Sequence, residues 1–165
     1  MVFKKTILTT IILLFSSLSY AEKISFTPEI NNILAKYPDR QDNLARNFIV
    51  LPPLENENNY KIEVFFGKTL MVDCNPKLLQ SEYPQQRKLE NTPYSYYLLN
   101  DVIVSSNNGN KCLNNQKSRQ FIPSLNSTLL LPYNSEYPLV FYIPRNIQVK
   151  YRILFPSQFQ DGYKG

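Results

Sequence analysis

The sequence has no histidine and no tryptophan, and it contains only two cysteines and four glycines among 165 residues. Without histidine the chain cannot form a Ser/His or Cys/His nucleophilic pair or an imidazole metal site. The glycines are too dispersed for a P-loop or a GxGxxG dinucleotide turn. Paired-carboxylate motifs are also lacking. We therefore expect a protein that is not an enzyme and that holds no cofactor and no metal.

The N-terminus has the pattern of a secretory signal peptide. Lys4 and Lys5 precede an apolar run over residues 7–18, which ends at the small-residue site Ser19-Tyr20-Ala21. We expect residues 1–21 to be removed and residues 22–165 to form a single domain. No apolar stretch reaches the roughly 18 residues that a membrane-spanning helix needs, so we expect no membrane span.

Charge is spread along the chain in single residues. The 18 Lys and Arg residues outnumber the 13 Asp and Glu residues, and the predicted cleavage removes two of the lysines. The remaining excess is small and unclustered, so nucleic acid is not an expected partner. The content of 43% hydrophobic residues with twelve prolines indicates a globular, turn-rich domain.

The two cysteines are predicted to form a disulfide. In an exported protein an even pair of cysteines is usually bridged, which gives Cys74–Cys112. Closing the loop between these two cysteines stabilises the folded state by about 4 kcal/mol in the chain-entropy model. The alternative is a redox-active thiol, which needs a cationic environment and usually a second cysteine two residues away; Lys111 alone is weak support for it.

Hydrophobic periodicity predicts an all-β protein with a short N-terminal helix. Apolar residues at Ile30, Ile33, Leu34 and Tyr37 share one helical face, and Pro38 ends the pattern. The period becomes two from Phe48 onward. We expect strands at residues 60–66, 69–74, 94–104, 119–122, 128–131, 139–143 and 147–155. Seven or eight short antiparallel strands separated by Pro, Asn and Ser clusters predict a β-sandwich or barrel.

A run of tyrosines, Tyr94, Tyr96 and Tyr97, is one candidate binding feature. These rings can stack on a ligand, but in a β protein such a run more often packs across strands with its hydroxyls at the rim. A second candidate is the polar stretch of residues 105–112, which composition alone describes as an exposed loop between two strands.

Short motifs occur in a fixed order along most of the chain, from about Ala35 to Leu154. They are Tyr37-Pro38 with Arg46 downstream, Gly67-Lys68-Thr69-Leu70, Val72-Asp73-Cys74-Asn75, Tyr94 with Tyr96-Tyr97, Tyr133-Asn134-Ser135, Pro138, and Val149-Lys150-Tyr151-Arg152. In order and spacing they resemble the ecotin family, which are periplasmic, dimeric inhibitors of trypsin-fold serine proteases. The resemblance implies a secreted protease inhibitor located in the periplasm.

The resemblance also implies an inhibitory loop that enters the protease as a substrate would. The loop consists of Ser106, Asn107, Asn108, Gly109, Asn110 and Lys111. In the family pattern the primary specificity residue lies three positions before the second cysteine, so the reactive bond would join Gly109 and Asn110. The family typically has methionine there. Glycine fills no deep pocket, so we expect inhibition mainly of elastase-like enzymes with shallow pockets.

An alternative for this loop is a plain hairpin. The pair Asn108-Gly109 strongly favours a two-residue type I′ turn, which would not present an extended backbone to a protease. The competing function is therefore a binding module that keeps the ecotin scaffold and has lost inhibition. An assay of the mature protein against several trypsin-fold proteases would separate the two.

A second protease contact is implied at the far end of the molecule. Its positions are Asn91, Thr92, Pro93, Pro132, Asn134 and Glu136. Thr92 stands where the family has tryptophan, and Pro132 and Glu136 stand where it has basic residues, whereas Asn134 is kept. We expect this contact to be weaker than in the family or aimed at another protease surface.

Family members dimerise by exchanging C-terminal strands, and this implies a homodimer formed through an arm at about residues 153–165. Phe155, Phe159 and Tyr163 are its expected anchors. Pro156 removes one backbone donor from the arm, and two glycines near the end favour mobility.

Overall fold

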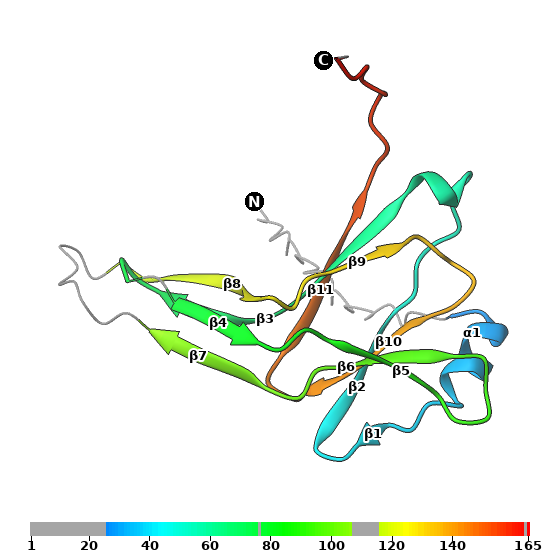
Figure 1. Cartoon of the computed structure of the whole chain (residues 1–165). Coiled ribbons are helices and arrows are strands. Elements are labelled where there is room, and N and C mark those ends of the chain that lie inside the picture. The colour runs from blue at the N-terminus through cyan, green and yellow to red at the C-terminus, as the bar shows by residue number, and fades with distance from the viewer. Residues whose placement is uncertain (1–25, 76, 107–115, 164) are drawn as a thin grey trace, which may run out of the picture.

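The computed structural model describes residues 26–75, 77–106, 116–163 and 165, which form two β-sheets and one short α-helix (Figure 1). The first sheet has the order β1 (Arg40–Gln41), β2 (Leu44–Ile49), β10 (Leu139–Pro144), β6 (Ser95–Leu98) and β5 (Gln85–Lys88). The second has the order β11 (Gln148–Leu154), β3 (Lys61–Val72), β8 (Ser118–Leu125), β4 (Lys77–Ser81) and β7 (Val102–Ser106), with β9 (Leu129–Pro132) also paired to β3. The all-β expectation is confirmed. The described residues hold 11 strands, more than the seven or eight expected.

The helix α1 (Pro28–Leu34) lies where the sequence predicts it. Thr27 caps its N-terminus, because its side-chain oxygen accepts a hydrogen bond from the Ile30 N–H at 3.4 Å. Pro28 suits the first turn, where its missing N–H costs nothing. Ile30 and Leu34 are buried against the first sheet, so the helix covers one face of that sheet.

Strand β3 joins two strands that the sequence suggested as separate, at residues 60–66 and 69–74. It runs without interruption through Gly67, which pairs with Pro123 of β8. A Cβ at Gly67 would overlap the Ile122 carbonyl oxygen and the Phe121 ring. Glycine thus lets β8 approach β3 closely instead of breaking the strand.

Two strand pairs are parallel, which corrects the expectation of a purely antiparallel fold. Strand β10 pairs in parallel with β6, and β4 pairs in parallel with β8. In both cases the chain visits the other sheet between the paired strands. It therefore returns in the same direction, as a crossover connection requires.

The sequence pattern predicts no strand at β1, β2, β4 or β5, and it predicts β6 and β7 as one strand. All four residues of β5 are exposed, so this strand carries no alternation of apolar and polar residues. The predicted strand at 94–104 divides after Leu98. There the Leu99 N–H bonds to the Tyr142 carbonyl in the first sheet, and β7 then joins the second sheet.

The first sheet is the middle layer of the molecule. Successive residues of β10 face alternate sides, so Phe141 packs toward the second sheet and Tyr142 toward α1. Between the sheets, the Phe66 and Phe141 rings meet edge to face with centroids 5.5 Å apart. On the helix side, Tyr96 and Tyr142 do the same at 5.1 Å. Two buried clusters therefore share one central strand.

Candidate functional site

The strands next to the predicted loop and the positions of the predicted second contact lie at opposite ends of the described residues (Figure 1). Strands β4, β7 and β8 project to one side, whereas α1, the β5–β6 loop and the β9–β10 loop lie at the other. Strand β7 ends at Ser106, which pairs with Lys77 at the start of β4. Cys74 lies in the bend that follows β3. The predicted loop residues Asn107, Asn108, Gly109, Asn110 and Lys111, and also Cys112, lie outside the described residues.

The loop between β5 and β6 is a compact turn held by Thr92. The Thr92 hydroxyl donates to the Leu89 carbonyl at 3.0 Å and accepts from the Tyr94 N–H at 3.2 Å. The Leu89 N–H bonds to the Tyr94 carbonyl at 2.8 Å. Asn91 adopts the left-handed conformation, with φ of 56°, which asparagine tolerates better than most residues. The Thr92 hydroxyl therefore stabilises the turn by hydrogen bonds within it.

The loop between β9 and β10 is held by hydrogen bonds around Asn134. The Asn134 side-chain oxygen accepts from the Glu136 N–H at 2.8 Å and from the Tyr137 N–H at 3.4 Å. The Ser135 N–H and hydroxyl bond to the Glu57 carboxylate at 3.1 and 2.6 Å. Glu57 begins the 3-10 helix η1 (Glu57–Asn59), and the Ser135 hydroxyl is the main cause that lowers the pKa of Glu57. The loop conformation is thus fixed both by hydrogen bonds within the loop and by hydrogen bonds to Glu57, which lies outside it.

A cleft of about 410 Å³ separates these two loops. Of the six predicted contact residues, Pro93, Pro132 and Asn134 line it, whereas Asn91, Thr92 and Glu136 do not. Its other walls are Tyr37, Gln86, Tyr94, Ser95, Tyr97, Leu131, Tyr137, Pro138, Leu139 and Val140. The Tyr94 and Tyr137 rings lie 5.9 Å apart and join the two loops. A hollow of about 640 Å³ continues from the cleft between β5 and β9.

The tyrosine run packs within the protein, as the simpler of the two sequence interpretations expects. The Tyr96 ring is 9% exposed and packs on Tyr142, and the Tyr97 ring stacks on Phe141 with centroids 5.8 Å apart. Burial raises the pKa of Tyr97. Tyr94 and Tyr97 nevertheless also line the cleft, so the same run contributes to both packing and surface shape.

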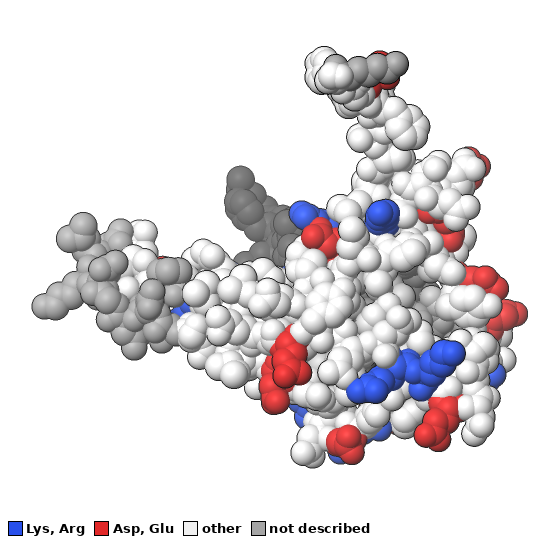
Figure 2. All heavy atoms as spheres, viewed as in Figure 1, with Lys and Arg blue, Asp and Glu red and all other residues white. Residues whose placement is uncertain are grey.

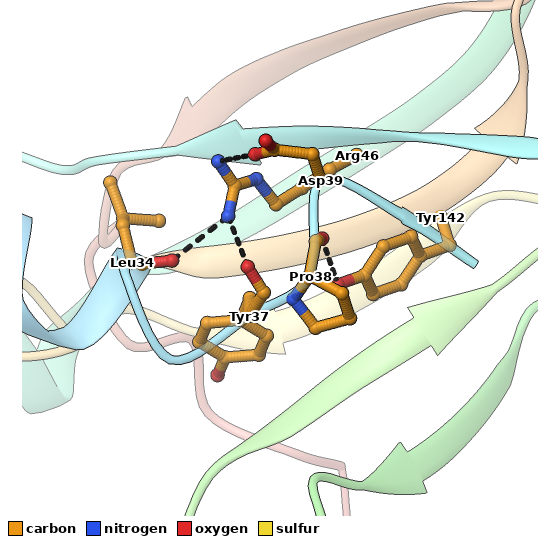
Figure 3. A network of polar contacts seen from close by, with 6 residues as sticks. All are labelled: Leu34, Tyr37, Pro38, Asp39, Arg46 and Tyr142. Atoms are coloured by element: carbon orange, nitrogen blue, oxygen red, sulfur yellow. Dashed lines mark hydrogen bonds and ion pairs between the residues drawn. The ribbon is translucent and has the colours of Figure 1, made fainter.

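A polar network behind the cleft gives the Tyr37, Pro38 and Arg46 motif a physical role (Figure 3). Arg46 Nη1 donates to the Leu34 carbonyl at 2.9 Å and to the Tyr37 carbonyl, and Arg46 Nη2 pairs with the Asp39 carboxylate at 2.6 Å. The Tyr142 hydroxyl donates to the Pro38 carbonyl at 2.6 Å. These contacts fix the segment that connects α1 to β1.

This network reaches the cleft through Tyr37. Its hydroxyl donates to the Ser95 carbonyl at 3.0 Å, directly after the β5–β6 loop. Its ring centroid lies 6.3 Å from that of Tyr94. Burial raises the pKa of both Tyr37 and Tyr142 to about 12, so both hydroxyls remain hydrogen-bond donors across the physiological range.

The C-terminal segment beyond β11 leaves the body of the protein (Figure 1). Phe155 is 75% exposed, and its one aromatic contact among the described residues is an edge-to-face contact with the Tyr60 ring, with centroids 5.8 Å apart. Phe159 and Tyr163 are fully exposed. The expected anchors therefore point to solvent in the single chain.

Charged side chains are interspersed over the body, and few lie on the projecting strands (Figure 2). Several apolar side chains are exposed on those strands, among them Leu78, Ile103, Val104 and Leu125. Within the described part of the chain, no three histidine, cysteine, aspartate or glutamate residues gather as a metal site would require. No helix in that part is long and apolar enough to cross a membrane.

Comparison with known proteins gives one consistent match. The family model described as "Ecotin" matches residues 33–155. The chain is similar to the ecotin of Pseudomonas putida (strain W619), with 37% identity over 125 residues that cover 76% of this chain and 78% of that protein. It is also similar to the ecotin of Pseudomonas fluorescens, at 35% identity with 72% and 75% coverage. The ecotin of Yersinia enterocolitica is 33% identical, with 73% and 71% coverage.

Proposed function

The chain belongs to the ecotin family, a family of protease inhibitors, and we propose that it inhibits trypsin-fold serine proteases with the loop Ser106 to Lys111. The match over residues 33–155 carries this proposal, because that range includes both sets of predicted contact residues and the strands of both sheets. Since the family inhibits proteases, the chain is proposed not to be an enzyme and to need no cofactor or metal.

The strands that lead to the loop support a preorganised presentation. Strand β7 pairs with β4 over five residues, from Val102 opposite Ser81 to Ser106 opposite Lys77, and β4 pairs with β8. A loop held at both ends by paired strands pays less ordering entropy on binding than a free peptide does. The proposed reactive bond, Gly109 to Asn110, lies three residues beyond the end of β7.

The proposed bridge between Cys74 and Cys112 fits this arrangement. Cys74 precedes Lys77 by three residues, and Lys77 pairs with Ser106. Cys74 therefore lies at the same end of the second sheet as the start of the loop. A bridge from there to Cys112 would fasten the returning half of the loop near its outgoing half.

Glycine at the primary position sets the proposed specificity. A trypsin pocket with its buried carboxylate would stay unpaired, whereas a narrow elastase-like pocket loses fewer contacts when no side chain enters. Loss of a central anchor commonly costs about 2–4 kcal/mol, or about 30- to 1,000-fold in affinity. We therefore propose elastase-like proteases as the better targets.

The proposal also covers the export of the protein and its assembly into a homodimer. Residues 1–21 are a cleaved signal peptide, residues 22–165 are one domain, and the oxidised protein resides in the periplasm. The arm at residues 153–165 is proposed to form a homodimer. The full exposure of Phe159 and Tyr163 supports this, because large aromatic side chains on an arm outside the body find cover in a second chain.

The test is an inhibition assay with mature protein, residues 22–165, against trypsin, chymotrypsin and neutrophil elastase, each followed with a chromogenic substrate. We expect elastase to be inhibited most strongly. Gly109→Met should add inhibition of chymotrypsin and trypsin, and Lys111→Ala, two residues beyond the primary position, should not abolish inhibition of any of the three enzymes. Loss of trypsin inhibition in Lys111→Ala would show that the reactive bond is placed wrongly. Inhibition of none of the three enzymes would favour the binding module.

A further inference from the structure

The second sheet has one side that packs on the first sheet and one side that points away from it. Phe66 of β3 is buried between the sheets, so its neighbour Phe65 points the other way. The pairing registers carry this alternation from β3 to β8, β9 and β11, and through β8 to β4 and β7. The residues of these strands that point away from the first sheet make up the outer face.

Four apolar side chains of the outer face are exposed to solvent. They are Met71 on β3, Leu78 on β4, Ile103 on β7 and Leu125 on β8, and each is 45–66% exposed. Ile103 and Leu125 flank Gln80 on its two sides, so the apolar side chains continue from one strand to the next. Apolar patches on the surface of a single chain mark places where a partner or a membrane binds.

The charged side chains of the outer face are mostly cations. They are Lys61 on β3, Arg119 on β8, and Lys150 and Arg152 on β11. Glu63 is the only acidic residue of this face in the described strands, and its carboxylate pairs with Arg152 at 2.5 Å. The other three cations form no ion pair among the described residues. The face therefore has an excess of positive charge beside its apolar side chains.

Two of the cations lie over aromatic rings of the same face. Lys150 Nζ is 4.4 Å from the centroid of the Phe121 ring, and the Arg152 guanidinium is 5.4 Å from that of the Phe65 ring. These charged groups are thus held close to apolar surface. Cations mixed with apolar side chains on one surface are typical of proteins that bind at the boundary between a membrane and water.

We propose that the outer face binds the surface of a membrane that contains anionic lipids. The cations bind the headgroup phosphates, and the four exposed apolar side chains enter the boundary between headgroups and acyl chains. A second copy of the chain fits less well, because a two-fold contact through this face would bring the same cations together. A soluble polyanion would bind the cations but leave the apolar side chains in water. The inference goes beyond the proposed inhibition and does not depend on it.

The first test compares equal changes of charge on two surfaces. Lys150→Glu combined with Arg119→Glu acts on the outer face, and both residues are exposed. The control combines Arg87→Glu with Lys88→Glu on β5, an exposed edge strand of the first sheet. Flotation measures binding of the mature protein to vesicles of phosphatidylcholine with and without phosphatidylglycerol, at low ionic strength. The outer-face variant should bind the phosphatidylglycerol vesicles at least about tenfold more weakly than the wild type, and the control less than about threefold.

The second test compares two exposed apolar neighbours on β7. Ile103 belongs to the outer face, whereas Val104 lies opposite the buried Leu79 and points to the other side of the sheet. Ile103→Ser should weaken binding to phosphatidylglycerol vesicles by about threefold, because its side chain enters the membrane boundary. Val104→Ser should bind as the wild type does. Thermal unfolding of all variants checks that the fold is kept.

Three results would overturn the inference. The first is a wild type that does not prefer vesicles with phosphatidylglycerol over those without it. The second is an equal loss of binding in the two charge variants, since net charge and not the outer face would then determine binding. The third is unchanged vesicle binding by Ile103→Ser, which would assign the cations to a soluble polyanion. Because none of these measurements uses a protease, failure of the proposed inhibition would leave the inference standing.

Discussion

The two ends of the molecule hold their backbones in different ways. At the end near α1, side chains bind main-chain carbonyls directly: the hydroxyls of Tyr37, Tyr133 and Tyr142 and the guanidinium of Arg46 all do so. At the projecting end, β4, β7 and β8 are held by strand pairing, and Ile103 is 66% exposed on β7. Beyond β7 no further strand pairs among the described residues.

The difference shows two routes to a fixed binding surface. The cleft end relies on buried rings and carbonyl bonds, which act over long separations in sequence and can be removed singly. The projecting end relies on backbone pairing between β4, β7 and β8 and on the proposed disulfide. Because the two ends share only the sheets between them, changes at one end should leave the binding properties of the other intact.

The largest loss of stability is expected from a substitution in the buried core near α1 and the cleft. Tyr142→Ala removes a fully buried ring together with its bond to the Pro38 carbonyl, and should lower the free energy of unfolding by about 3–5 kcal/mol. Ile103→Ala, at the exposed end, should change it by less than about 0.5 kcal/mol. Urea unfolding of both variants measures this contrast. Similar losses in the two would show that the projecting strands are packed against something in solution.

The next effect is expected from the proposed disulfide. Replacing Cys74 and Cys112 together by serine should lower the free energy of unfolding by about 2–4 kcal/mol under oxidising conditions. The variant should also inhibit more weakly, because the loop loses one anchor. Wild type in excess reductant is the matched control and should approach the variant. If reductant leaves wild-type stability unchanged, the two cysteines are not bridged.

The third largest loss of stability is expected at the partly buried Arg46, compared with the exposed Arg152. Arg46→Ala removes two bonds to carbonyls from a side chain that is only 20% exposed, and should cost about 2 kcal/mol. Arg152→Ala removes an ion pair with Glu63 from a side chain that is 66% exposed, and should cost less than about 1 kcal/mol. Chemical unfolding at neutral pH measures both. A larger loss in Arg152→Ala would contradict the distinction between the two arginines.

The sequence predicted those elements whose apolar residues repeat with a clear period. The helix is one case, because Thr27, Pro28 and the face of Ile30 and Leu34 all indicate it. The strand β11 is another, because its residues alternate. Strand β5 escaped prediction because it lies at a sheet edge with four exposed residues, and tertiary pairing alone makes it a strand.

The sequence predicted which residues belong to the candidate site, but it did not predict the shape of the site. The family resemblance implied Pro93, Pro132 and Asn134 as contact positions, and the structure brings these three around one cleft. That a cleft forms there depends on Tyr94 meeting Tyr137 and on Tyr37 reaching Ser95, contacts between residues about 40 and 60 positions apart. Local patterns carry no information on such contacts. The Tyr37 and Arg46 motif was visible, but its role became clear only from the hydrogen bonds.

The smallest expected effect is the change in stability with falling pH that comes from one carboxylate at each end of the molecule. Bonds from Ser135 lower the pKa of Glu57 beside the cleft, and the Asn75 N–H, 2.9 Å away, lowers the pKa of Asp73 beside the projecting strands. A carboxylate whose pKa is lower in the folded than in the unfolded chain stabilises the fold above its ordinary pKa. The unfolded chain takes up the proton first, so this stability is lost as the pH falls below about 4–4.5.

Glu57→Gln and Asp73→Asn should therefore each flatten the acid limb of the stability curve, measured by urea unfolding between pH 6 and pH 3. Amide chemical shifts distinguish the ends. The Ser135 N–H should follow the titration of Glu57 and lose that response in Glu57→Gln, while it keeps its response in Asp73→Asn. The Asn75 N–H should behave in the opposite way. If Ser135 also responds to Asp73→Asn, the two ends are coupled through the sheets, and the independence argued from their different construction fails.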